Sequence, residues 1–160
     1  MKFFLSLLLV SFFYVAPNLV DVRTMFEKAA NNKENTQKLY QELEDYQQKN
    51  QTILAYKGAS EMLYSRYNGN KEIKKKLLTN GSNLIENSIK SDPKNIEIRL
   101  IRFILQENLP KAIHYNKNFV EDRQLIVNQY KNQTKEVKSL IKKYSKQSKT
   151  FTAKDKANFN

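Results

Sequence analysis

Two arginines one helical turn apart, Arg99 and Arg102, have the clearest chemical potential in this sequence. They interrupt the otherwise apolar stretch IEIRLIRFIL at 96–105, and a guanidinium group is costly to bury without a partner. One interpretation is a clamp for an anion or a carboxylate, because arginine offers two parallel donors. His114 and Tyr115, in the loop that follows, would complete this binding site.

The second interpretation is that the two arginines pair inside the protein. Glu121 and Asp122 begin the next helical pattern, and pairing with them or with loop carbonyls would hold residues 110–118 in place. We favour this interpretation, because a buried arginine ordinarily has an acidic partner. The two interpretations differ in what the loss of an arginine does. Internal pairing predicts lost stability, whereas a clamp predicts lost binding with the fold intact.

The familiar catalytic signatures are absent from the sequence. It has no cysteine and one histidine, His114, which disfavours thiol nucleophiles and metal sites built on cysteine or histidine. It also lacks H-E-x-x-H, G-x-S-x-G, P-loop and G-x-G-x-x-G motifs. We therefore predict no catalytic residue, no metal site and no cofactor. The enzymatic alternative is a hydrolase with two carboxylates, drawn from Glu86, Glu97, Glu107, Glu121 and Asp122.

Positive charge gathers toward the C-terminus of a chain whose formal net charge is +12. A basic segment can bind lipid headgroups, cell-wall polymers or nucleic acid, although most such segments are simply solvated. Only Tyr144 and Phe151 interleave with these lysines, so specific nucleic-acid recognition is not expected. Residues 145–160 show no period and are predicted to be a disordered tail. The candidate polyanion-binding residues are Lys135, Lys138, Lys142, Lys143, Lys146 and Lys149.

A set of helices must position these residues. The stop at Ser91-Asp92-Pro93 separates two of them, because proline cannot continue a helix. Asn95 can cap the next helix, which is apolar nearly all round and is therefore expected at the centre of the fold. Helical spacing predicts further helices near 21–30, 35–48, 51–67, 71–91, 118–130 and 134–144. The fold class is all-α: one antiparallel bundle or array of six to seven helices over residues 20–144.

Two features of the predicted helices concern their packing. Ala55, Gly58 and Ala59 form a stripe of small residues that lets another helix approach closely. Five tyrosines from neighbouring helices could line an exposed groove for a peptide or glycan, or could close the core with their hydroxyls at its rim. We favour the core for most of Tyr40, Tyr46, Tyr56, Tyr64 and Tyr67.

The N-terminus has the pattern of a secretory signal peptide. Lys2 precedes the apolar run FFLSLLLVSFFYV at 3–15, which is shorter than the ~20 residues needed to span a bilayer. We predict cleavage near Ala16, with an uncleaved anchor as the alternative. The protein is then exported, to the periplasm or the cell exterior, and has no membrane-spanning segment after cleavage.

The segment around Asp92-Pro93 resembles the seam between two tetratricopeptide units. Gly81, Ile85 and Ser88 hold the small, large and small positions that precede the proline in that motif. Departures occur in the unit's first helix, with Ser65, Asn68 and Glu72 at its large apolar positions, and no 34-residue period repeats. The resemblance implies a partly tetratricopeptide-like array.

A larger part of the chain is similar to a family of small secreted proteins of Bacteroidota. The similar segments are VRTMFEKAANNKEN (22–35), YKGASEM (56–62), SDPKNIEIRLIRFILQENLP (91–110) and HYNKNFVEDRQLI (114–126). This resemblance implies an exported, all-helical protein and supplies no catalytic residues. We expect a non-enzymatic interaction or scaffold module of the cell envelope whose partner is another protein. The alternatives are binding of an anionic surface through the basic C-terminus and the hydrolase. The sequence defines no oligomeric state.

Overall fold

The computed structural model describes residues 17–30 and 32–159. The regular elements in this part of the chain are all helices, and it contains no strand. The all-α prediction is confirmed, whereas the predicted signal peptide, residues 1–16, lies outside the described residues. None of the described helices combines the length and the apolar character needed to cross a membrane. The α-helices are α1 (Leu19–Ala29), α2 (Lys33–Leu43), α3 (Gln51–Tyr64), α4 (Lys71–Ser91), α5 (Ile96–Asn108), α6 (Phe119–Gln129), α7 (Lys135–Gln147) and α8 (Ala153–Asn158). Short 3-10 turns are η1 (Ser65–Tyr67), η2 (Lys111–Ile113) and η3 (Tyr130–Asn132).

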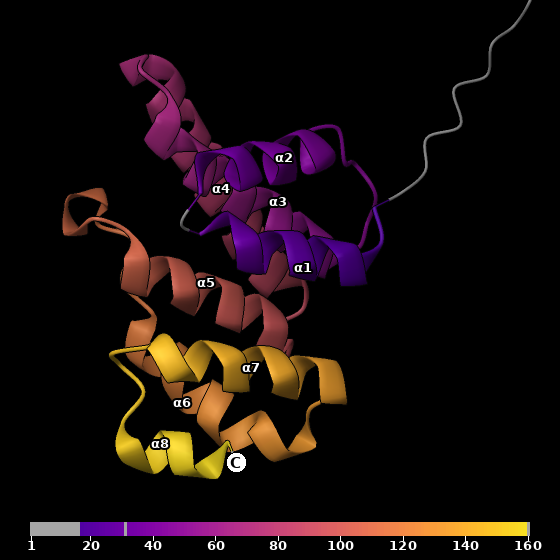
Figure 1. Ribbon diagram of the computed structural model, residues 1–160, viewed down its shortest axis with the longest axis vertical. Coiled ribbons are helices and arrows are strands. Elements are labelled where there is room, and N and C mark those ends of the chain that lie inside the picture. Colours follow the sequence, from indigo (N-terminus) through magenta and orange to yellow (C-terminus); the bar gives the residue numbers. More distant parts are fainter. Residues whose placement is uncertain (1–16, 31, 160) are drawn as a thin grey trace, which may run out of the picture.

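Helix α5 lies between two groups of helices, as its nearly all-round apolar surface predicts (Figure 1). One face, with Ile98, Ile101 and Leu105, belongs to a first core shared with α1–α4. The other face, with Leu100 and Phe103, belongs to a second core shared with α6, α7 and the residues that flank α8. The two cores therefore meet at a single helix, which leaves α5 little surface for polar residues.

Asparagine side chains begin most of the helices. Oδ1 of Asn95 accepts hydrogen bonds from the backbone N–H groups of Glu97 (3.1 Å) and Ile98 (3.2 Å), which confirms the predicted cap of α5. These bonds satisfy donors that the first turn of a helix leaves free. The stop before Pro93 is also confirmed, since α4 ends at Ser91. The first four helices are capped in the same way by Asn18, Asn32, Asn50 and Asn70.

Helix α2 is shorter than its pattern predicts. It ends at Leu43 and not near Gln48. Nζ of Lys57, from α3, donates to the carbonyl oxygens of Glu44 (2.7 Å) and Tyr46 (3.0 Å). These bonds satisfy carbonyls just past the helix end. Tyr46 nevertheless lies in the first core, after a turn in which its backbone N–H donates to the carbonyl oxygen of Leu43 at 3.0 Å.

Helices α3 and α4 approach each other closely, as the small residues of α3 predict. A Cβ atom on Gly58 would collide with the carbonyl oxygen of Gly81 and lie 3.0 Å from side-chain atoms of Leu84 and Ile85. A Cβ atom on Gly81 would collide with the carbonyl oxygen of Gly58 and lie 2.6 Å from the side chain of Met62. Each helix has glycine where the backbone of the other passes, so neither position has room for a side chain.

Replacing Gly58 with alanine is expected to destabilise the protein by about 1–3 kcal/mol, although alanine is the better helix former by about 1 kcal/mol. The added methyl group must push α3 away from the backbone of α4, and urea unfolding would measure the loss. Gly69→Ala is the control, because a Cβ atom there meets nothing within 4 Å. A gain in stability for Gly58→Ala would show that the two helices do not touch there.

The C-terminal segment is ordered, and the prediction of a disordered tail over residues 145–160 is wrong for the part that is described, up to residue 159. Helix α7 continues to Gln147, and α8 follows after a short loop. Phe151 and Phe159, before and after α8, are 3% and 1% exposed. Both rings pack in the second core, where their centroids lie 5.1 Å apart. The segment therefore completes that core.

Polar contacts also fix the C-terminal segment. Thr152 and Asp155 form a capping box at the start of α8. The guanidinium of Arg123, on α6, donates to the carboxylate of Asp155 at 2.8 and 2.5 Å. The hydroxyl of Tyr130 donates to the carbonyl oxygen of Phe159 at 2.9 Å. These bonds tie both ends of α8 to α6 and η3.

Candidate functional site

Arg102 and Asp122 form a buried ion pair between α5 and α6. Arg102 is 2% exposed and Asp122 is 0% exposed. Nε and Nη2 of Arg102 donate to the two carboxylate oxygens of Asp122 at 2.7 and 2.8 Å, a bidentate arrangement. Nη1 donates to Glu86 of α4 at 2.6 Å. Burial acts to lower the pKa of Arg102, but Asp122 and Glu86 raise it above its ordinary value, so the guanidinium stays charged.

Arg99 joins the same cluster one turn earlier on α5. Its Nη1 donates to Glu121 at 2.9 Å and to Asp122 at 3.0 Å, and its Nη2 donates to the carbonyl oxygen of Pro93 at 3.3 Å. Hydrogen bonds from Asn118 and from Arg99 lower the pKa of the Glu121 carboxyl. These contacts confirm the internal pairing that the sequence favours, with Pro93 as an additional acceptor.

The loop between η2 and α6 contributes one of its two candidate residues to this cluster. The hydroxyl of Tyr115 donates to Glu86 at 2.8 Å, and burial together with the charge of Glu86 raises the pKa of Tyr115. His114 is exposed and has a left-handed backbone, with φ of 53°. Arg102 thus shares Asp122 with Arg99 and Glu86 with Tyr115, whereas the side chain of His114 lies at the surface.

A second buried carboxylate, Glu97 of α5, links three helices whose contact the sequence does not predict. Arg23 of α1 donates from Nε and Nη2 to the two carboxylate oxygens of Glu97 at 2.7 and 2.6 Å. The hydroxyl of Tyr56, on α3, donates to the same carboxylate at 2.8 Å. Hydrogen bonding to Glu97 raises the pKa of Arg23. The one available signal was an acid on a helix that is apolar nearly all round, and nothing in the sequence pointed to Arg23.

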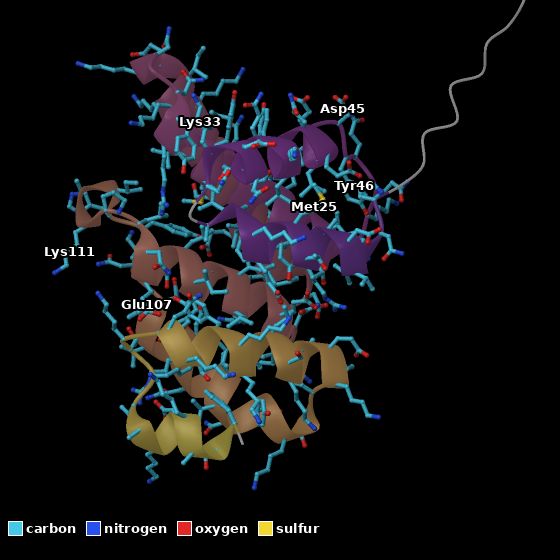
Figure 2. The ribbon with its side chains drawn as sticks, viewed as in Figure 1. Met25, Lys33, Asp45, Tyr46, Glu107 and Lys111 are labelled. Atoms are coloured by element: carbon cyan, nitrogen blue, oxygen red, sulfur yellow. The ribbon has the colours of Figure 1, made fainter. Side chains whose placement is uncertain are left out.

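A third carboxylate, Glu107, lies where the end of α5 meets the segment that follows α7 (Figure 2). It accepts hydrogen bonds from the Tyr144 hydroxyl at 2.5 Å, the Ser148 hydroxyl at 3.1 Å and the Thr150 hydroxyl at 3.0 Å. The backbone N–H groups of Lys149 and Thr150 donate to it at 2.6 and 2.9 Å. Burial acts to raise the pKa of Glu107, but these hydrogen bonds lower it below its ordinary value.

Replacing Glu107 with glutamine is expected to destabilise the protein at pH 7 by about 1–3 kcal/mol. Because the folded-state pKa is lowered, the contribution of Glu107 is fully present above its unfolded pKa of about 4.3 and is lost as the pH falls through the folded-state value. The difference in the free energy of unfolding between wild type and Glu107→Gln should therefore become smaller at acidic pH. Urea unfolding at pH 7 and below pH 4 measures this, with Glu42→Gln at an exposed position as the control. A difference that does not depend on pH would contradict the role of the charge.

A groove of about 570 Å³ lies between the two cores. Its floor is α5, and one wall comes from α1 and α3 with Phe26, Tyr56 and Leu63. Leu140 and Tyr144 of α7 form the facing wall. The charged lining residues are Glu27, Arg66, Glu107, Lys143 and Lys149. The groove therefore has apolar walls and mixed charge at its rim.

The six lysines proposed to bind polyanions fall into two groups. Lys143 pairs with Glu27 of α1 at 3.0 Å, at the rim of the groove. Lys149 follows α7 and also lines the groove. The remaining four have the spacing i, i+3, i+7 and i+11, which keeps them on one face of α7: Lys135, Lys138, Lys142 and Lys146.

Two of the five tyrosines lie in the first core, fewer than the predicted majority. Tyr46 and Tyr56 are 2% and 1% exposed. Tyr40 and Tyr64 stack with their centroids 4.5 Å apart, and Tyr67 is exposed. The core interpretation is confirmed for the buried pair, and Tyr56 combines both roles because it also lines the groove.

Comparison of the chain with models of protein families, with curated proteins and with solved structures found no match in any of the three. The resemblances given by the sequence segments therefore stay predictions.

Proposed function

We propose that the protein is an exported, non-enzymatic interaction module of the cell envelope that holds a segment of another protein in the groove between α1, α5 and α7. The observation that carries this proposal is the groove itself. Its volume of about 570 Å³ falls within the range of about 300–1,000 Å³ typical of ligand sites. Ile104 of α5, which is half-buried, lies on the apolar floor, where it can meet a partner's side chain above the buried Leu100 and Ile101.

The groove joins two separately packed cores, which makes it a suitable place for recognition. Its walls belong to different halves of the fold, and the ion pair between Lys143 and Glu27 connects them. Arg66 donates to the carbonyl oxygen of Asn108 and adds a cation to the rim. A partner segment with apolar side chains and flanking polar groups would match this lining.

The partners of the buried acids support a non-enzymatic role over the hydrolase. Asp122 and Glu97 are each held by arginine through two hydrogen bonds. The two acids that line the groove are also engaged, Glu27 by Lys143 and Glu107 by hydroxyl and backbone donors. A pair of carboxylates that acts in hydrolysis needs one acid to exchange a proton with substrate, and these contacts oppose that.

The cell-envelope assignment rests on two features of the sequence. The first is the signal-peptide pattern of residues 1–16, and the second is the similarity of residues 22–35, 56–62, 91–110 and 114–126 to secreted helical proteins of Bacteroidota. Both features indicate export. The partner that binds in the groove is then expected to be another protein of the cell envelope.

A photo-cross-linking experiment tests this function. A benzophenone amino acid at Leu140, on the groove wall, should cross-link one envelope protein. The same probe at Val120, which is 64% exposed and does not line the groove, should not. Filling the groove by Ala30→Trp, at the residue that follows α1, should abolish the cross-link, while Val20→Trp at an exposed position of α1 should keep it. Equal cross-linking from both probe positions, or none from either, would refute the proposal.

A further inference from the structure

One face of α7 carries a row of lysines that the groove does not use. Lys135, Lys138, Lys142 and Lys146 form this row, called here the α7 lysine row. The opposite face of the helix, with Val137, Ile141 and Tyr144, is buried in the second core. Since the apolar face fixes the orientation of α7, the lysine row must point outward. Lys135, Lys142 and Lys146 are exposed, and Lys138 is half-buried.

No salt bridge in the described part of the chain engages this row. Lys143, on the flank toward α1, pairs with Glu27. Glu136, seven residues before Lys143, lies on the same flank of the helix. Both Arg23 of α1 and Lys135 of the row act on its carboxylate, without a salt bridge to Lys135. On the neighbouring elements, Asp155 is bound by Arg123.

We infer that the α7 lysine row is a docking surface for the anionic phospholipid headgroups of a membrane. Four unpaired cations are spaced along about 16 Å of a straight helix at 1.5 Å per residue, on the outside of the fold. This row of positive charge is complementary to the negatively charged surface of a membrane that contains anionic phospholipids. This surface is separate from the groove and would hold the protein at the membrane whatever the groove binds.

A nucleic-acid strand fits the row less well than a membrane does. Binding of single strands relies on aromatic side chains on which bases stack. The aromatic residues that interleave with these lysines in the sequence, Tyr144 and Phe151, are 7% and 3% exposed and pack in the second core. The row therefore offers charge without a stacking platform.

The expected binding is electrostatic and peripheral. The apolar face of α7 is committed to the core, so the helix cannot insert it among lipid chains as an interfacial amphipathic helix does. Attraction of lysines to an anionic surface falls off within a Debye length. Binding should therefore be weakened strongly by salt.

Sedimentation with lipid vesicles tests the inference on the mature chain, residues 17–160. Vesicles of phosphatidylcholine with phosphatidylglycerol should bind the protein at low salt, and vesicles of phosphatidylcholine alone should not. The variant K135Q/K138Q/K142Q/K146Q should bind at least about tenfold more weakly, since each lysine near an anionic surface contributes a severalfold effect. The matched control K71Q/K74Q/K75Q/K76Q removes the same charge from the exposed start of α4 and should keep most of the binding.

Four outcomes would overturn the inference. They are equal loss in both quadruple variants, unchanged binding in the α7 variant, equal binding to uncharged vesicles, and binding of a DNA oligonucleotide or heparin through the row without binding to vesicles. Circular dichroism checks that the variants are folded. If the quadruple variant of α7 is not folded, K142Q/K146Q against K74Q/K75Q decides the same question.

Discussion

Replacing Arg102 with methionine is expected to destabilise the protein by about 3–5 kcal/mol. Methionine fills a similar volume without the charge, so the carboxylate of Asp122, which is 0% exposed, loses two of its hydrogen bonds. Arg99 would remain as a partner at 3.0 Å, but through a single bond. Glu86 is partly exposed, so water can solvate it and its loss of Arg102 matters less.

Urea unfolding of Arg102→Met measures this effect, and Arg66→Met is the matched control. Arg66 donates one hydrogen bond, to a carbonyl oxygen near the surface, so its replacement should cost about 1 kcal/mol. Adding Asp122→Asn to Arg102→Met should restore part of the loss, because the second change removes the uncompensated buried charge. A stable Arg102→Met protein that has lost affinity for an anion would instead support the clamp.

The arginine cluster could be predicted because burial and charge conflict within one short segment. Arg99 and Arg102 interrupt the apolar sequence 96–105, so acids had to lie nearby, and Glu121 and Asp122 are only about twenty residues away. The pairing of Arg23 with Glu97 joins positions 74 apart. No local pattern marks such a contact, because it depends on how α1 is placed across α5.

The first residue of a helix was harder to predict than the helix itself. Asn95 was recognisable as a cap because a proline stop precedes it and an apolar run follows. The first helix was predicted to begin near residue 21, but Asp21 lies inside α1, and the cap is Asn18. Both residue types accept hydrogen bonds from a first turn equally well. The apolar stripe alone therefore located the helix but not its first residue.

The groove could not be predicted, because it exists only between the two cores. Its walls come from α1, α3 and α7, and no sequence period tells how far apart helices from different cores lie. The tyrosines illustrate the limit. Tyr56 has the spacing of a core residue, and its ring does lie in the first core. The same side chain also lines the groove and donates a hydrogen bond to Glu97, which the spacing does not predict.

The disordered-tail prediction failed because the C-terminal segment is anchored by single residues rather than by a repeating stripe. Helix α8 has only six residues, which is too short to show a period. Its attachment depends on Phe151 and Phe159, which lie outside the helix itself. The basic composition of the segment was correctly recognised, but it describes the outer surface and says nothing of these two rings.

Replacing Phe151 with alanine is accordingly expected to destabilise the protein by about 3–5 kcal/mol. Its ring is 3% exposed and lies 4.8 Å from the ring of Phe103 and 5.1 Å from that of Phe159, between centroids. A cavity would open in the second core where α8 joins it, and α8 is too short to hold its place by helix propensity. Urea unfolding measures the loss, and Val120→Ala, at a position 64% exposed, is the control with an expected effect within about 0.5 kcal/mol.

The packing of Phe151 also determines whether truncation of the C-terminal segment can test the role of its lysines. If Phe151→Ala behaves as expected, a chain cut after Tyr144 loses both phenylalanines and the donors to Glu107 from Ser148, Lys149 and Thr150, so that only the Tyr144 hydroxyl remains. Its loss of membrane or protein binding would then report a damaged core and not the missing lysines. If Phe151→Ala is as stable as the Val120→Ala control, the segment does not pack as described, and truncation becomes a valid test of the charge of residues 145–160, with Lys135, Lys138 and Lys142 of the row still present. The lysine-to-glutamine variants avoid this ambiguity because they leave the apolar contacts of the second core in place.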